Sequence, residues 1–211
     1  MHLLHPATTN EDLLQLMLTG DETALETLYA RLHPVIYRFA FRMGGSAALA
    51  DDVSQETFLQ LIQEGARFDP SRGNATAYLL GIARHVLWNR LDRDQKFVPL
   101  AETSDESDLS PTTSIDLTTP LTSVLQHETV ENVRLAITGL PAHYRDVVVL
   151  CDLQELSYQD VATILGCPIG TVRSRLHRAH DVLCQRLFQF RNASLDVSVQ
   201  LHPAERNHRC A

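Results

Sequence analysis

A tight turn between two helical patterns, late in the chain, constrains the fold more than any other feature. Gly166 can adopt the left-handed backbone that ends a helix, and Pro168 suits the first turn of the next one, where its missing N–H is not needed. Ser157 can cap a first helix over residues 158–165. Two helices joined this closely must cross steeply, as in a helix-turn-helix. The second helix places four apolar residues on one inward face: Val172, Leu176, Ala179 and Leu183.

The opposite face of this second helix is polar and cationic, which favours contact with duplex DNA. Ser174, His177 and Arg178 point away from the apolar residues, and Arg173 and Arg175 flank them. Guanidinium groups can bind phosphates or the edge of a guanine. The alternative to DNA contact is an ordinary core helix with a solvated polar face. DNA contact is favoured because the turn residues, the cap of the first helix and the placement of the arginines all fit a helix-turn-helix. The candidate DNA contacts are Thr171, Arg173, Ser174, Arg175, His177 and Arg178.

The charge of the whole chain, −8 from 18 basic and 26 acidic residues, is unusual for a nucleic-acid binder. Most of this negative charge lies in residues 97–132, which contain seven acids and no Lys or Arg. Residues 170–191 instead contain five arginines and one acid, Asp181. The predicted DNA-contacting helix is therefore locally cationic in an acidic chain.

We predict an all-α fold of two small helical domains, because helical spacing recurs along the chain and no strand pattern competes with it. The first domain is placed at residues 10–96 and the second at residues 126–190, each with a core of its own. A flexible acidic linker at 97–125 joins them, since it is too rich in Pro, Ser, Thr and acids to offset its ordering entropy. A disordered tail at 191–211 is expected to follow.

The first domain contains a turn-rich loop at residues 68–76 that leads into a helix predicted over 77–93. Aromatic rings on this helix alternate with cationic and amide side chains, a combination that suits unpaired bases and their phosphates. When the helix is considered alone, core packing is the favoured explanation of Tyr78 and Trp88, since such rings are more often part of a core. Two further helices are expected upstream, over residues 22–43, with a kink or restart at Pro34, and over residues 48–64.

Neither the cysteines nor the tail predicts a metal site or a cofactor. Cys151, Cys167, Cys184 and Cys210 form no CxxC pair and are expected to be free thiols, mostly structural. Cys151 and Cys184 occupy apolar helical positions, so we expect both to pack against apolar neighbours. His202, His208 and Cys210 lie on a terminus and would make only a weak site. No nucleophile, base and orienting group occur in a recognisable arrangement, so an enzyme is not expected. With no apolar run of ~20 residues and no signal-peptide pattern, we expect a soluble, cytoplasmic protein.

Several motifs in fixed order resemble one family. The acidic helix at 51–58, the loop and helix at 67–93, Leu140-Pro141 and the helix-turn-helix together resemble a bacterial RNA polymerase sigma factor of the sigma-70 family. The resemblance is to its compact extracytoplasmic-function (ECF) type and covers about residues 10–96 and 126–188. It implies core RNA polymerase and promoter DNA as partners, with an anti-sigma factor as a possible third.

The resemblance also implies a role for each candidate residue. Asp52, Gln55 and Glu56 would dock on the polymerase, and the helix-turn-helix would read the −35 element as duplex. The remaining residues would bind the opened −10 element: Phe68, Asp69, Arg72, Asn74, Tyr78, Arg84, His85 and Asn89. The chain departs from the family at His85, where Asn is common, and at His180, where Arg is frequent.

Two other readings compete with the sigma factor. The first is a stand-alone helix-turn-helix regulator whose N-terminal helices dimerise or sense a signal. The second is a metal- or thiol-responsive sensor that acts through the cysteines and the tail. The acidic linker is expected either to occupy a basic polymerase channel as a polyanion or to serve as a spacer.

Overall fold

The computed structural model describes residues 8–97 and 120–200, leaving aside the side chains of residue 72 and of residues 94–97, 120–128 and 191–200. Helices dominate this part of the chain and no strand occurs in it, which confirms the predicted all-α fold. The N-terminal domain consists of α1 (Asn10–Leu18), α2 (Glu22–Gly44), α3 (Ala47–Glu64) and α4 (Ala75–Phe97). The C-terminal domain consists of α5 (Pro120–Thr138), α6 (Ala142–Val148), α7 (Tyr158–Leu165) and α8 (Ile169–Gln200).

Three short turns complete the helical pattern. Two 3₁₀ turns, Gly65–Arg67 and Pro70–Arg72, connect α3 to α4, and a π-helical turn, Val149–Leu153 (η3), follows α6. Within the described residues, every helix is too short or too polar to cross a bilayer.

Polar caps explain where several helices begin. The Thr9 hydroxyl accepts a hydrogen bond from the Asp12 N–H, and the Asp12 carboxylate accepts one from the Thr9 N–H, which completes a capping box for α1. The Asp21 carboxylate caps α2, and the Ser46 hydroxyl caps α3. These caps satisfy N–H groups that have no partner inside the helix.

The observed helices differ from the predicted ones at four places, of which the first is α4: it spans Ala75–Phe97, whereas the sequence predicts a helix over 77–93. Helix α5 begins at Pro120, inside the predicted linker, because proline is well tolerated at the first helical position. Helix α8 extends to Gln200, inside the predicted tail, because residues 191–200 contain neither Gly nor Pro to stop it. Helix α2 continues through Pro34 without the restart that the sequence predicts.

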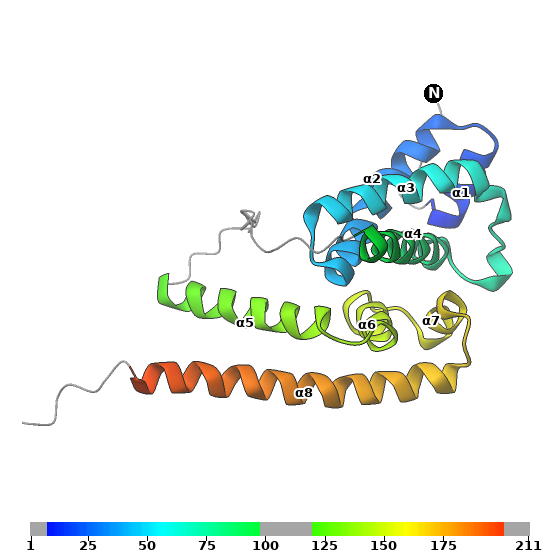
Figure 1. Cartoon of the computed structure of the whole chain (residues 1–211). Helices are drawn as coiled ribbons and strands as arrows, with labels where there is room; N and C mark the ends of the chain where they lie inside the picture. Colours follow the sequence, from blue (N-terminus) through cyan, green and yellow to red (C-terminus); the bar gives the residue numbers. More distant parts are fainter. Residues whose placement is uncertain (1–7, 98–119, 201–211) are drawn as a thin grey trace, which may run out of the picture.

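The C-terminal domain lies directly against the N-terminal domain. Helix α8 runs along the lower side of the molecule, and α6 and α7 lie between it and α4 (Figure 1). Helix α5 is antiparallel to α8 and packs beside it (Figure 1). The −10 candidate helix α4 and the helix-turn-helix therefore belong to one packed assembly.

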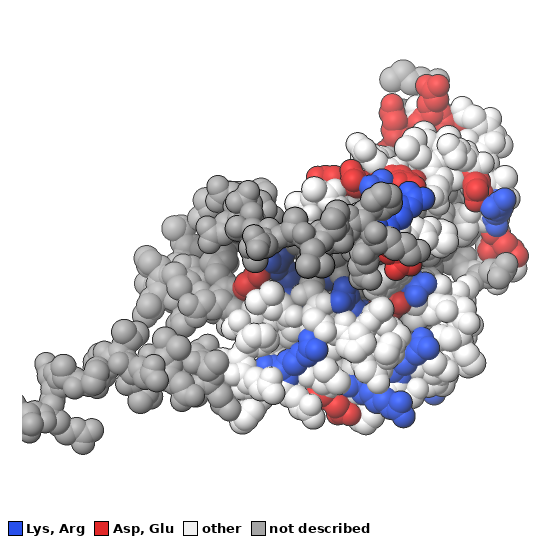
Figure 2. Space-filling model, in the orientation of Figure 1, with Lys and Arg blue, Asp and Glu red and all other residues white. Residues whose placement is uncertain are grey.

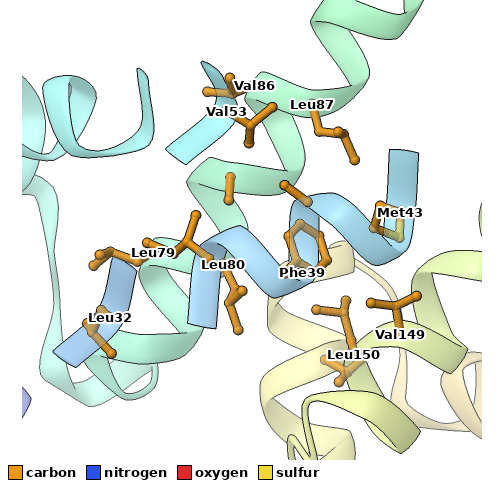
Figure 3. Packing of buried hydrophobic residues seen from close by; sticks show 14 of the residues in the cluster. Leu32, Phe39, Met43, Val53, Leu79, Leu80, Val86, Leu87, Val149 and Leu150 are labelled. Carbon is orange, nitrogen blue, oxygen red and sulfur yellow. The ribbon is translucent and has the colours of Figure 1, made fainter. Parts of the chain in front are cut away.

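The two domains share one hydrophobic core, although the sequence predicts a core for each. Phe39 and Met43 of α2 face Val149 and Leu150 of η3 across the domain boundary (Figure 3). All four side chains are fully buried, and they belong to one continuous cluster that extends through both domains. The contact between domains thus removes apolar surface from water, which stabilises the closed arrangement.

Candidate nucleic-acid interface

The helix-turn-helix forms as its turn residues predict. The Ser157 hydroxyl accepts a hydrogen bond from the Asp160 N–H at 3.1 Å and caps α7. Gly166 has φ +60°, the left-handed conformation, so the N–H of Cys167 can reach the Ala162 carbonyl at 3.1 Å. The carbonyl of Pro168 then accepts from the N–H groups of Thr171 at 2.8 Å and Val172 at 3.2 Å, in the first turn of α8. This geometry sets the direction in which α8 leaves the turn.

The two faces of α8 separate as the helical spacing predicts. Val172, Leu176 and Ala179 are buried, whereas Leu183 is half-buried. Four of the candidate DNA contacts are exposed, namely Arg173, Ser174, His177 and Arg178, and Thr171 and Arg175 are half-buried.

The exposed face of α8 is cationic. The Arg173 guanidinium lies over the Tyr158 ring at 5.8 Å from its centroid, and no described carboxylate forms an ion pair with Arg173, Arg175 or Arg178. Arginines line the lower part of the molecule, where α8 lies (Figure 2). These three arginines can bind a polyanion without first breaking an ion pair, whereas His177 lies 3.9 Å from the Asp181 carboxylate.

A cavity of about 450 Å³ opens beside the N-terminal half of α4. Five of the −10 candidates line it: Phe68, Asp69, Asn74, Tyr78 and His85. The Phe68 and Tyr78 rings lie 5.4 Å apart between centroids. Aromatic faces beside amide, imidazole and carboxylate groups can stack on a flat base and hydrogen-bond to its edge.

Further residues of the cavity wall escape prediction from the sequence. Gln60, Glu64 and Arg67 line the cavity from the end of α3 and the turn after it, and Thr163 and Ile164 line it from α7 of the other domain. Gln60 is one turn before Glu64 on α3, so helical spacing alone could have grouped these two. No pattern in the sequence near α7 predicts that this helix lies beside the cavity.

Hydrogen bonds within the domain hold the loop that forms the cavity. The Asp69 carboxylate accepts from the Ser71 N–H at 3.0 Å, and the Asn74 side-chain carbonyl accepts from the Ala77 N–H at 2.7 Å. Glu11 of α1 reaches this loop and accepts from the Ala75 N–H at 2.8 Å. Burial raises the pKa of Tyr78, with a smaller effect from Glu64, so its phenol stays protonated and can donate to the Glu64 carbonyl.

Three −10 candidates do not line this cavity. The side chain of Arg72 is outside the described residues. Asn89 is exposed and hydrogen-bonded to His85 at 3.0 Å. Arg84 points to the C-terminal domain, where its Nη2 lies 2.7 Å from Oδ2 of Asp146 on α6. The structure therefore brings most of the predicted −10 residues together but directs Arg84 elsewhere.

The predicted polymerase-binding residues share one exposed face of α3. Asp52 and Glu56 each form an ion pair at 2.7 Å with the same Arg90 guanidinium of α4, and Gln55 is exposed beside them. Leu59 and Ile62 continue this face with side chains that are 58% and 54% exposed. They are one and two turns beyond Gln55, so helical spacing places them on the same face. The sequence analysis considered only the polar side chains of this face and did not predict that these two would be exposed.

The three described cysteines are free thiols that differ in exposure. Cys151 and Cys167 are half-buried, but Cys184 is exposed, so the sequence expectation of an apolar packing site is wrong for Cys184. Within residues 8–97 and 120–200 no group of three or more metal-ligating side chains gathers. His202, His208 and Cys210, the weak metal candidates, are outside the described residues.

Two conserved regions of one known family match this chain in sequence. Residues 28–97 match sigma-70 region 2, and residues 131–180 match sigma-70 region 4. The ECF RNA polymerase sigma factor SigW of Bacillus subtilis is 30% identical over 171 residues, covering 80% of this chain and 91% of that protein. A probable RNA polymerase sigma-C factor of Mycobacterium bovis is 34% identical over 164 residues, covering 78% and 83%. SigE of Mycolicibacterium smegmatis is 28% identical, and the match spans 63% of its length.

Two solved structures share the fold. One is the sigma factor RpoE of Bartonella quintana in complex with the anti-sigma factor NepR, with a TM-score of 0.60 and 23% identity, covering 77% of this chain and 95% of RpoE. The other is CnrH in complex with the cytosolic domain of CnrY, with a TM-score of 0.61 and 23% identity, covering 84% and 96%. At this identity the likeness concerns the fold alone.

Proposed function

This chain belongs to the sigma-70 family of RNA polymerase sigma factors, in its ECF type, and we propose that it binds core RNA polymerase and reads a promoter at two places. The −35 element would be read as duplex by α8, and the −10 element as an opened strand at the cavity beside α4. One observation carries the proposal: an exposed cationic recognition face and a cavity of about 450 Å³ with aromatic side chains in its wall occur in one chain.

Helix α8 is suited to the major groove of the −35 element. Its apolar face is buried, so the helix is held rigidly, and Arg173, Ser174, His177 and Arg178 project outward within two turns. Arginine reads guanine by two hydrogen bonds, and the flanking side chains can position the helix on the phosphates. Discrimination of duplex sequence would come from this face.

The cavity beside α4 is suited to a base of the −10 element. Extrusion of a base costs a few kcal/mol of stacking, which a matching pocket must offset. Phe68 and Tyr78 offer ring faces, and Asn74, Asp69 and His85 offer donors and acceptors for the edge of the base. Capture of the base would hold the duplex open near the start site.

The outer face of α3 is the proposed docking surface for the polymerase. Asp52, Gln55 and Glu56 supply the polar contacts, and the exposed Leu59 and Ile62 add apolar area at the same place. Interfaces commonly combine an apolar centre with a polar rim. Because two of the structures with this fold hold partners named NepR, an anti-sigma factor, and the cytosolic domain of CnrY, we also propose an anti-sigma partner for this chain.

Transcription in vitro with purified core polymerase tests the proposal. Core enzyme alone and core enzyme with this chain are given a library of genomic fragments, and the 5′ ends of the transcripts are sequenced. We expect specific start sites only when the chain is present, preceded by a shared pair of sequence elements. Failure to co-purify with core and to start RNA at any fragment overturns the proposal, and tight binding of the free chain to duplex as a dimer would favour the stand-alone regulator.

A further inference from the structure

Helix α1 contacts both ends of the segment between α3 and α4 that forms part of the −10 cavity, although none of the predicted −10 residues lies on it. It lies beside α4 and the turn after α3 (Figure 1). Leu13 and Leu14 of α1 are fully buried, so the helix is anchored in the core of the N-terminal domain. Helix α1 precedes residue 28, where the match to sigma-70 region 2 begins, so that match assigns it no role.

The start of this segment packs against the last turn of α1. A methyl group at Gly65 would lie only 3.3 Å from the side chains of Met17 and Leu18, so glycine permits this close approach. Gly65 is buried, and its carbonyl accepts a hydrogen bond from the Phe68 N–H at 3.0 Å. The position of α1 therefore bears on where Phe68 enters the cavity.

At the other end of the segment, the Glu11 carboxylate binds the first turn of α4. Its Oε1 accepts from the Ala75 N–H at 2.8 Å, and Nδ2 of Asn10 donates to Oγ1 of Thr76 at 3.4 Å. The Ala75 N–H is the first of α4, so no carbonyl of the same helix can accept from it. Ala75 is fully buried, and an unpaired N–H in such a place is costly. The Glu11 acceptor therefore stabilises this backbone position.

Glu11 reaches α4 from a backbone that is itself held in place. The capping box of Thr9 and Asp12 fixes the first turn of α1, to which Glu11 belongs. Nη1 of Arg31 on α2 donates to the Thr8 carbonyl at 2.7 Å, just before this cap. The carboxylate thus acts from a fixed base, and less side-chain freedom is lost when it binds α4.

Two −10 candidates take their positions from this turn of α4. Asn74 directly precedes Ala75, and its side-chain carbonyl accepts from the Ala77 N–H at 2.7 Å. Tyr78 follows within one turn, and its N–H donates to the Asn74 carbonyl at 3.1 Å. Recognition groups must be held within about 0.5 Å of their productive positions. A shift of the Ala75 backbone would therefore move both side chains relative to a base in the cavity.

We propose that Glu11 is a positioning residue for −10 recognition: its hydrogen bond to the first turn of α4 fixes the places of Asn74 and Tyr78 in the cavity. The proposal deepens the function proposed above and rests on it. Glu11 does not line the cavity, so its removal should reduce only the part of the binding that depends on the captured base. Contacts to the phosphates, which carry no sequence information, should persist.

Three substitutions separate the hydrogen bond from the charge. Glu11→Ala removes the acceptor for the Ala75 N–H. Glu11→Gln keeps a side-chain carbonyl of the same reach and removes only the charge, so it should retain most of the wild-type behaviour. Glu26→Ala is the matched control, because it removes an exposed glutamate from α2 in the same domain.

Binding is measured with holoenzyme assembled from core polymerase and the full-length chain. The probes are labelled single strands that carry the −10 element of a promoter found by transcription, intact or with an abasic site at one −10 position in turn. The position at which the abasic site weakens wild-type binding most marks the captured base. We expect Glu11→Ala to lower the ratio of intact to abasic affinity at this position about tenfold, because stacking in the cavity is lost. Glu11→Gln and Glu26→Ala should keep the ratio near that of the wild type.

A cap that matters only for stability would lower the affinity for both strands by the same factor. That result, an unchanged ratio, or a Glu11→Gln chain as poor as Glu11→Ala overturns the inference. If Glu11→Ala does not fold, Asn10→Ala removes the neighbouring contact to Thr76 and should lower the ratio by a smaller factor, and an unchanged ratio again overturns the inference. Equal binding of intact and abasic strands by the wild-type holoenzyme at every position would instead overturn base capture, and with it the proposed function of the cavity.

Discussion

At the residue scale, the thiol of Cys151 differs from the exposed thiol of Cys184. Burial, with a smaller effect from Asp152, raises the pKa of Cys151 to about 11. The thiolate is the reactive form, so Cys151 is protonated and inert near neutral pH. A raised folded pKa stabilises the fold at pH below the unfolded value of 9.0, and this contribution decreases as the pH rises from there toward about 11.

We therefore predict that iodoacetamide modifies Cys184 much faster than Cys151 in the folded chain near neutral pH. Peptide mass spectrometry over a time course measures both rates. The same reaction in denaturant is the control, since unfolding should make the two rates similar. Equal rates in the folded chain would show that burial does not protect Cys151 and would revive a thiol-sensing role for it.

At the element scale, α8 has one face that packs against the domain and an opposite face that is exposed for DNA contact. Buried Val172 and Leu176 fix the helix against the domain, and exposed Arg178 lies on the opposite side. Removal of Arg178 should leave folding intact and weaken DNA binding, because no buried contact is lost.

Arg178→Ala is predicted to reduce binding to the −35 duplex by about 1–3 kcal/mol if the guanidinium reads a base. Fluorescence anisotropy with matched and mismatched duplexes measures the loss and shows whether specificity relaxes. Arg31→Ala removes the same charge from α2 in the other domain and is the control. Equal small losses for the two variants would mean that Arg178 contributes only general electrostatic attraction.

At the scale of the whole molecule, the two domains are joined by direct contacts and by the acidic linker. Hydrogen bonds from Arg84 and Trp88 of α4 to Asp146 of α6 are among those contacts. Of the linker, residues 97–125, the structure describes only Phe97, the last residue of α4, and the part from Pro120, where α5 begins. Its charge supports a role as a polyanion in a basic polymerase channel, displaced by growing RNA.

Conversion of Glu102, Asp105, Glu106 and Asp108 to their amides should reduce the share of abortive transcripts, because a neutral linker is displaced more easily. Gel analysis of short and full-length RNA from one promoter measures this share. Amides at Glu22 and Glu26 of α2 are the control for loss of surface charge. An unchanged ratio of abortive to full-length RNA would leave the linker as a spacer.

Helices, caps and the division of faces on α8 could be predicted because they depend on neighbours a few positions apart. The bounds of α7 and its caps at Ser157 and Gly166 agree with the prediction. The end of α8 was missed, because residues 191–200 look polar and terminal although nothing in them stops a helix. Leu59 and Ile62 were missed because exposure of an apolar side chain depends on what packs beside it.

The sequence by itself determined the fold class, the family, and the identity of most candidate side chains, since periodicity, turn chemistry and motif order are local. Only the tertiary structure decided what those side chains meet. The ion pair of Arg84 with Asp146 joins residues 62 positions apart, and Thr163 reaches the cavity beside α4 from the other domain. Such pairings follow from burying apolar surface between domains, a collective effect with no periodic signature in the chain.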